Sequence, residues 1–199
     1  MASMAADQER CAMRGPKSRF LLLALVLAAV AAGCDLFDDN GSSTNGGSLN
    51  VYLQDAPGNV TELWVKLDAI TLYPDPSSPG VGVVADGQPA SIDLIATAGG
   101  SPTQAATFAL DDGSYQCISG TLALDHFVAD DGQGGQATCT TVNGMSSIDI
   151  PKVCLPAPFL MVDGGAVSVL VDLPVVSGSC DPATGDGTLA FSSPSASLM

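Results

Sequence analysis

Few side chains of this sequence suit acid–base or nucleophilic catalysis. The 199 residues include a single histidine, His126, in the stretch LDHFV near the expected end of a strand. Catalysis needs a base positioned beside its partner, whereas a histidine at a strand end is usually solvated or hydrogen-bonded. Adjacent carboxylates occur at 38–39, 111–112 and 130–131, but neighbouring residues of a strand point to opposite faces, so these pairs indicate turns. We therefore predict that the protein is not an enzyme.

Two acidic loops have the residue types that bind calcium. Asp130 and Asp131 lie in ADDGQGG, and Asp181 and Asp186 lie in DPATGDG. Ca²⁺ takes six to eight oxygen ligands, which loops of this kind often supply. Neither loop has the D-x-[DN]-x-[DN]-G spacing, so solvated acidic turns are the main interpretation and calcium sites are the alternative. No other metal or cofactor is expected.

Four of the six cysteines are expected to form two disulfides. The other two are Cys11 and Cys34, and Cys34 is expected to carry a lipid. An even number of cysteines in an exported domain is typical of disulfides, and the four are Cys117, Cys139, Cys154 and Cys180. A zinc site is the competing interpretation, but no two cysteines lie close together and there is only one histidine. All three pairings stay open, and the shortest loops favour Cys117–Cys139 with Cys154–Cys180.

An apolar segment near the N-terminus predicts export. Phe20–Ala32 has no polar side chain, and its 13 residues are fewer than the about 20 that a membrane-spanning helix needs. The length suits the apolar region of a signal peptide, about 7–15 residues, and a cationic stretch at 14–19 precedes it. Residues 1–12 contain two acids and fit a signal poorly. We expect translation to start at Met13 and the signal peptide to end at residue 33.

The end of this segment predicts lipid attachment at Cys34. The run VAAGC at 30–34 resembles the bacterial lipoprotein box, in which small residues precede an obligatory cysteine, although Ala31 stands where leucine is preferred. A plain signal peptide with a chance cysteine at the cut is the alternative. One acyl chain binds a membrane only marginally, whereas several chains hold it firmly. The expected partner of the mature chain is therefore membrane lipid, through an acylated Cys34.

Composition after Cys34 predicts a tether followed by an acidic domain. Residues 34–48 are rich in Gly, Ser, Asn and Asp and should form a flexible lipidated linker to a domain at 49–199. Loss of residues 1–33 removes two acids and four bases, which leaves 19 acids, two lysines and a net charge of -17. Such a surface repels nucleic acid, so we exclude it as a partner. We expect the outer membrane or the cell surface rather than the inner membrane; Asp35 leaves the leaflet open, because lineages sort lipoproteins by different rules.

The sequence of the domain predicts a series of short β-strands. Apolar residues alternate with polar ones at 49–54 and again from 63 to 67, after which the apolar set shifts by one position. A bulge near Asp68–Ala69 would cause this shift. Residues 74–82 should be a loop, and the pairs Asn143–Gly144 and Gly164–Gly165 should form hairpin turns. Further strands are expected at 91–95, 105–110, 114–124, 136–142, 146–150, 158–162, 166–173 and 188–192. Short strands at this spacing predict an all-β fold, an antiparallel β-sandwich.

The start of the domain resembles a known family. Residues 47–57 read GSLNVYLQDAP, similar to the G-x-L-x-V-x-L-x-D-A-P opening of the prokaryotic lipoprotein domain called domain of unknown function 4382. The IDLI stretch at 92–95 and the unit around Gly113 and Tyr115 match that family more loosely. The resemblance spans roughly 47–192 and implies a transthyretin-like or immunoglobulin-like sandwich with no known reaction. Four cysteines are additions to the family pattern.

Two classes of function remain. The first is a non-catalytic binding or structural module of the cell envelope, with an envelope protein or a glycan as partner. The second is an accessory subunit or a carboxylate-dependent hydrolase acting on glycans, which two facing carboxylates with shifted pKa values would support. Trp64, Tyr52 and Tyr73 could stack on sugar, although cross-strand packing is the commoner role of such residues. Asp55 should be structural, capping a turn, with ligand binding as the alternative, and Tyr115 should anchor its hydroxyl to nearby backbone.

Overall fold

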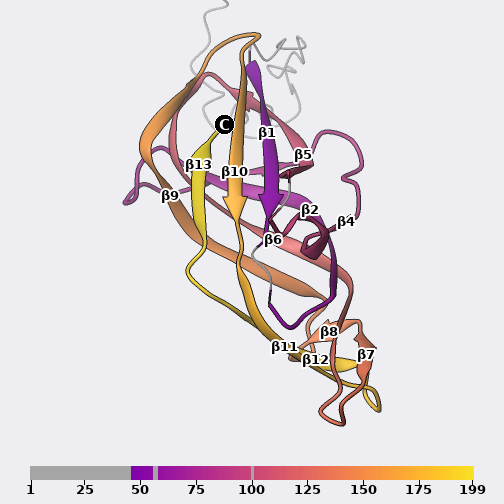
Figure 1. Cartoon of the computed structure of the whole chain (residues 1–199). Coiled ribbons are helices and arrows are strands. Elements are labelled where there is room, and N and C mark those ends of the chain that lie inside the picture. The colour runs from indigo at the N-terminus through magenta and orange to yellow at the C-terminus, as the bar shows by residue number, and fades with distance from the viewer. Residues whose placement is uncertain (1–45, 56–57, 100) are drawn as a thin grey trace, which may run out of the picture. The chain divides into compact units, whose positions relative to one another are not determined.

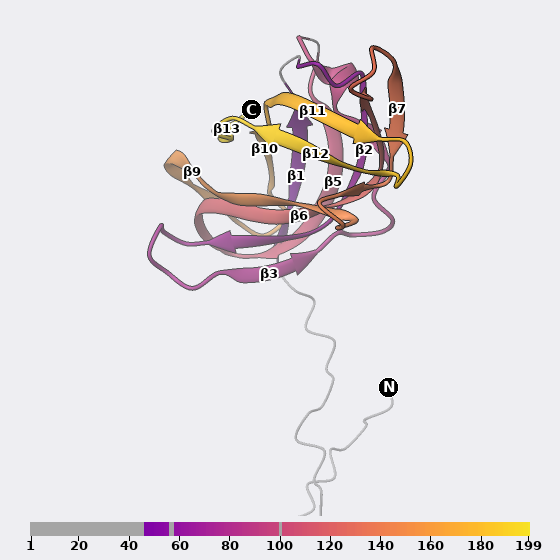
Figure 2. The same cartoon turned by 90° about the horizontal axis from the view of Figure 1, so that it is seen from below.

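The fold is all-β, as the strand pattern predicted. The computed structural model describes residues 46–55, 58–99 and 101–199, which form a domain of two packed sheets (Figure 1). The four-stranded sheet has the order β13-β10-β1-β5, and its strands are β1 (Gly46–Gln54), β5 (Thr103–Asp111), β10 (Ala166–Asp172) and β13 (Ser195–Leu198). Figure 2 shows the second layer, which contains β3, β6 and β9, with β1 and β10 to one side of it.

The nine-stranded sheet is built around β6 (Gly113–Asp130). Its main path has the order β3-β2-β6-β11-β12-β8, while β4 pairs with β2, and β7 and β9 pair with β6. The remaining strands are β2 (Glu62–Tyr73), β3 (Val81–Val84), β4 (Ile92–Asp93), β7 (Gln136–Cys139), β8 (Thr141–Val142), β9 (Ser147–Met161), β11 (Val175–Asp181) and β12 (Asp186–Phe191). A short 3₁₀ helix, η1 (Ile95–Thr97), follows β4. The sheets are mixed rather than purely antiparallel, because β1–β10, β11–β6 and β12–β8 are parallel pairs.

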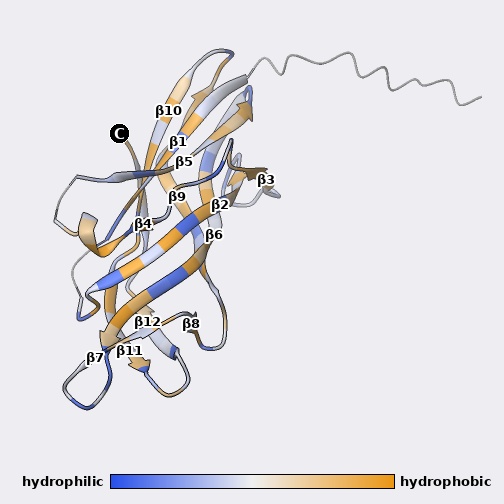
Figure 3. Cartoon of the chain, turned by 90° about the vertical axis from the view of Figure 1, so that its right-hand side faces the viewer, coloured by the Kyte–Doolittle hydropathy of each residue, from blue (hydrophilic) through white to orange (hydrophobic). Residues whose placement is uncertain are grey.

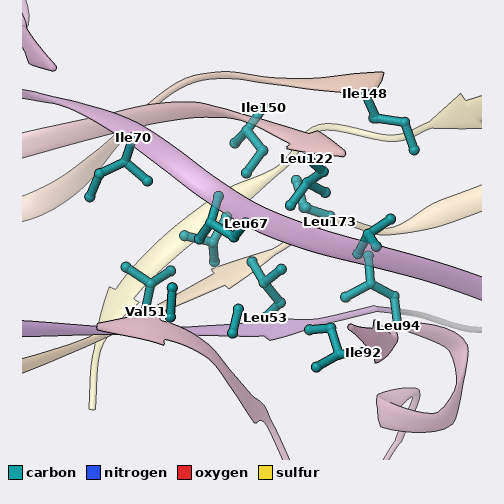
Figure 4. Packing of buried hydrophobic residues seen from close by; sticks show 14 of the residues in the cluster. Val51, Leu53, Leu67, Ile70, Ile92, Leu94, Leu122, Ile148, Ile150 and Leu173 are labelled. Atoms are coloured by element: carbon teal, nitrogen blue, oxygen red, sulfur yellow. The ribbon is translucent and has the colours of Figure 1, made fainter. Parts of the chain in front are cut away.

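The two-residue period of the strands explains the core between the sheets. Leu49, Val51 and Leu53 of β1 are fully buried and face the buried residues of β2. Figure 4 shows side chains from both strands filling the space between the ribbons, with Leu67 close to Val51 and Leu53. The expected bulge is confirmed, because the β2–β6 register shifts between Leu67 and Ala69. The bulge keeps the next apolar residues of β2 facing the core.

Several expected boundaries were wrong for identifiable reasons. Strand β9 runs through three prolines, at 151, 156 and 158, where two separate strands were expected. Proline lacks an N–H donor but is tolerated where one edge of a strand is unpaired, and β9 pairs with β6 alone. Strand β3 occupies part of the expected 74–82 loop, and β11 and β13 were not expected at all.

The two predicted hairpin turns have different outcomes. Asn143 and Gly144 both have positive φ, 52° and 76°, and a bridge joins Val142 to Met145, which confirms the tight turn. The Gly164–Gly165 turn is not a hairpin. It carries the chain from β9 in the nine-stranded sheet to β10 in the four-stranded sheet, where the N–H of Ser48 donates to the carbonyl of Gly165 at 2.8 Å.

The structure contains both disulfides but corrects the favoured pairing. The bonds are Cys117–Cys154 and Cys139–Cys180, not Cys117–Cys139 and Cys154–Cys180. Loop length misled the prediction, because the long curved β6 brings Cys117 opposite Cys154 of β9 in the sheet register. The second bond joins β7 to β11 at the end of the domain that also carries β8 and β12, opposite the start of β1 (Figure 1).

Candidate functional site

The chain's rarest side chains gather on the outer face of β2 and β6. We define the Trp64 face as Glu62, Trp64 and Lys66 of β2 with Asp125 and His126 of β6. It contains the sole tryptophan and the sole histidine of the sequence. Since Leu63, Val65 and Leu67 are fully buried, the residues between them point outward. Figure 3 shows hydrophobic and hydrophilic residues alternating along β2 and β6.

One end of this face is an aromatic pair with a shared carboxylate. Trp64 and His126 are opposite each other in the sheet register, and their rings are stacked with centroids 6.0 Å apart and planes inclined by 20°. The indole Nε1–H donates to Glu62 Oε2 at 3.2 Å, and His126 Nε2 lies 3.6 Å from the same oxygen. The His126 side chain is 35% exposed and that of Glu62 is 49% exposed. The group therefore offers a ligand a flat aromatic surface beside an accessible hydrogen-bond acceptor.

The other end is an ion pair supported from a neighbouring segment. Lys66 Nζ donates to Asp125 Oδ1 at 3.0 Å, and the Ser91 hydroxyl donates to the other carboxylate oxygen. The bond from Ser91, followed by that from Lys66, holds the pKa of Asp125 below its ordinary value. Asp125 is thus a fixed anionic acceptor and is poorly suited to act as a general acid.

A hollow continues from the ion pair along β2. It has a volume of about 320 Å³ and is lined by Lys66 and Asp68 on one side and residues 87–89 on the other. Pockets for small molecules begin at about 300 Å³. The Trp64 face and this hollow together form the candidate binding surface, with polar groups beside a single aromatic platform.

The carboxylates proposed for calcium already accept hydrogen bonds from protein groups, within their own loop or from a neighbouring segment. Asp131 Oδ1 accepts from the N–H groups of Gln133 and Gly135 at 2.7 and 2.9 Å, and these bonds lower its pKa. Asp186 Oδ1 accepts from the N–H of Gly144 at 3.0 Å and from the Thr141 hydroxyl at 2.8 Å, which lowers the pKa of Asp186 as well.

The other two carboxylates proposed for calcium have similar partners. Asp130 accepts from the N–H of Gly132, and Asp181 from that of Ala183. Across the residues that the structure describes, no three histidine, cysteine or carboxylate side chains form a metal-binding group. The pKa values of Asp131 and Asp186 are lowered by hydrogen bonds from backbone N–H groups and, for Asp186, also from the Thr141 hydroxyl, so they lend no support to an acid–base pair.

Asp55 and Tyr115 both have structural contacts. Asp55 is 1% exposed, and its Oδ1 accepts from the N–H of Val175 at 2.6 Å, a bond across 120 positions of sequence. This bond is long-range, whereas the local turn cap predicted for Asp55 involves residues 56 and 57, outside the described part. The Tyr115 hydroxyl donates to the carbonyl of Asp111 at 3.2 Å, as expected for a tyrosine anchored to nearby backbone. Desolvation, and then the charges of Asp111 and Asp112, raise the pKa of Tyr115.

Two features of the four-stranded sheet were not predicted from the sequence. Asp172 of β10 is half-buried, burial raises its pKa, and no partner for its Oδ1 is found among the described residues. On the same sheet, Asn50 Oδ1 accepts from Gln104 at 3.1 Å and from Thr107 at 2.9 Å, and the Tyr52 hydroxyl donates to Gln104 at 3.3 Å. The alternation along each strand indicates that these residues point away from the core, but nothing in the sequence indicates which of them form hydrogen bonds with one another.

Several predictions concern residues outside the described part of the chain. These are the signal peptide, the start at Met13, the lipid site at Cys34 and most of the 34–48 linker. Within the described ranges there is no helix of the length and apolar character that crossing a membrane would require.

Comparison with known proteins decides the family. Residues 46–189 match the family described as "Domain of unknown function (DUF4382)". The chain belongs to this family. The match begins at the first residue of β1 and reaches into β12, so it includes the Trp64 face and every strand except β13 and the end of β12. No curated protein and no solved structure matches the chain. The more specific expectation, that the fold resembles transthyretin-like or immunoglobulin-like domains, therefore stays a prediction.

Proposed function

We propose that this member of the DUF4382 family is a lipid-anchored module of the bacterial cell envelope that binds a partner without catalysis. The observation that carries the proposal is the apolar segment ending in Ala31-Ala32-Gly33-Cys34, twelve residues before β1. The two disulfides support it, because such bonds persist in oxidising compartments outside the cytoplasm. We place the module at the outer membrane or the cell surface.

Replacing Cys34 by serine tests the anchor. In bacterial cells, the wild-type chain should enter the membrane fraction, and its N-terminal peptide should carry acyl mass on Cys34. The C34S chain should leave that fraction, because a single hydroxyl replaces the group that holds the acyl chains. The matched control is C11S, whose cysteine precedes Met13 and should have no effect. Wild-type protein with an unmodified Cys34 would refute the anchor.

The Trp64 face is the binding surface that we propose, with a neutral glycan as the ligand class. Aromatic rings present an apolar face to a partner, while Glu62 and Asp125 supply acceptors for hydroxyl groups. The net charge of -17 predicted for the mature chain disfavours acidic glycans by repulsion. An envelope protein is the alternative occupant of this face.

Trp64→Ala should weaken glycan binding about tenfold or more, since aromatic anchors dominate most binding surfaces. Binding would be found with a glycan array and measured by calorimetry. Tyr52→Ala is the matched control, because Tyr52 is a partly exposed aromatic residue on the other sheet. Equal loss in both variants, or a wild-type domain that binds no glycan, would contradict the assignment.

A further inference from the structure

Exposed apolar side chains gather at the end of the domain where the predicted tether enters. Leu160 is 67% exposed, Val162 50%, Leu198 48% and Met199 61%. We call these four residues the apolar rim. They come from the ends of β9 and β13, which lie alongside one another (Figure 1). Single exposed apolar residues are ordinary, but a group at one end of a domain indicates a surface that meets a partner.

Backbone contacts place the rim beside the start of β1. The N–H of Gly164 donates to the carbonyl of Gly46 at 3.1 Å. A Cβ atom on Gly47 would lie 2.2 Å from Met161 Sδ and 3.0 Å from the carbonyl oxygen of Val162. The N–H of Met199 donates to the carbonyl of Ser168, which is opposite Asn50 in the register. The β9 part of the rim is thus next to Gly46, where the chain enters the domain, and the β13 part is level with Asn50, four residues further along β1.

The chain before this point limits how far the rim can be from the anchor. Eleven residues lie between Cys34 and Gly46, so the Cα atoms of these two residues can be at most about 43 Å apart when the chain is fully extended. A tether of this length keeps a weakly binding surface at a high local concentration near its target. An anchored domain would therefore present this end to the bilayer repeatedly.

We propose that the apolar rim docks onto the surface of the bilayer that holds the acylated Cys34. In this orientation the start of β1 faces the membrane. This inference rests on the proposed lipid anchor. The turns at the same end carry Asp111, Asp112 and Asp163. The two lysines of the described residues make contacts elsewhere, Lys66 with Asp125 and Lys152 with the carbonyl of Pro76. The rim should therefore prefer zwitterionic lipid and avoid anionic lipid.

Hydroxyl-radical footprinting of the lipidated chain on phosphatidylcholine vesicles tests the orientation. Oxidation of Leu160, Val162 and Met199 should fall severalfold relative to the C34S chain in solution. Val81 and Val84 of β3 serve as internal controls, because they are 56% and 75% exposed and lie outside the rim. Their oxidation should not change. Added phosphatidylglycerol should reduce the protection of the rim.

A paired variant tests the apolar contact itself. Leu160→Ser with Val162→Ser should restore oxidation of Met199 on vesicles, whereas Val81→Ser with Val84→Ser should leave it protected. Equal oxidation of the rim on vesicles and in solution, with acyl mass present on Cys34, would overturn the docking inference alone. Absence of acyl mass would instead refute the proposed anchor, and the inference with it.

Discussion

Replacing both Cys139 and Cys180 by serine is expected to lower the free energy of unfolding by about 4 kcal/mol. The two cysteines are 41 residues apart, and the chain-entropy relation gives about this value for a loop of that length. Small domains have stabilities of roughly 5–15 kcal/mol, so the loss is a large fraction of the total. Urea unfolding of the oxidised wild type and of the double variant measures it.

The other disulfide provides a matched comparison. Cys117 and Cys154 are 37 residues apart, so the same relation predicts nearly the same loss of global stability, about 4 kcal/mol. The local effect should differ, because β6 and β9 are also joined by an antiparallel ladder, whereas β7 and β11 are not paired with each other. Amide hydrogen exchange should therefore rise around β7, β8, β11 and β12 only when Cys139–Cys180 is removed. Peptide mapping that finds Cys117 bound to Cys139 would contradict the pairing.

The sequence predicted the parts of this fold that depend on local pattern. The alternation along β1 and β2 placed their buried faces correctly, and the shift near Asp68 located the bulge. Asn143–Gly144 was predictable because a tight turn with two positive φ angles favours these residue types. Each of these features is decided by residues that are neighbours in sequence.

Features decided by distant residues could not be predicted in the same way. The pairing of Cys117 with Cys154 depends on how far β6 extends and on β9 continuing through its prolines. The Gly164–Gly165 turn has the composition of a hairpin, yet the strand after it pairs in parallel with β1. Sequence pattern gives the face of each strand but not its neighbour in a sheet.

The candidate site likewise combines features that local sequence predicts with features that depend on distant residues. Alternation along β2 indicated that Trp64 faces outward, and the sequence marked it as the only tryptophan. Its contact with His126 required the β2–β6 register, which contains two shifts. The partners of Asp125 come from Lys66 and Ser91, which are 59 and 34 residues away. A site assembled from two strands and a connecting segment has no motif of consecutive residues to find.

Asp55→Ala is expected to lower the free energy of unfolding by about 2–3 kcal/mol, the usual cost of leaving a buried group without its charged hydrogen-bond partner. The carboxylate accepts from the N–H of Val175, a residue that is 1% exposed and could not turn to water. The backbone N–H of Asp55 also donates to Thr97 Oγ1 at 3.2 Å, and the Thr97 hydroxyl donates to the carbonyl of Leu94 at 2.6 Å. Asp55 therefore joins the end of β1 to the start of β11 and to η1.

Two further variants separate this long-range role from a general effect of losing a carboxylate. Asp55→Asn keeps an oxygen that can accept from Val175 and should lose less stability than Asp55→Ala. Asp86→Ala removes an exposed carboxylate and should change the free energy of unfolding by less than about 0.5 kcal/mol. Thermal or urea unfolding distinguishes the three. If Asp55→Ala were as stable as Asp86→Ala, the bond to Val175 would not hold the sheets together, and the Asp-Ala-Pro opening would need a role in binding instead.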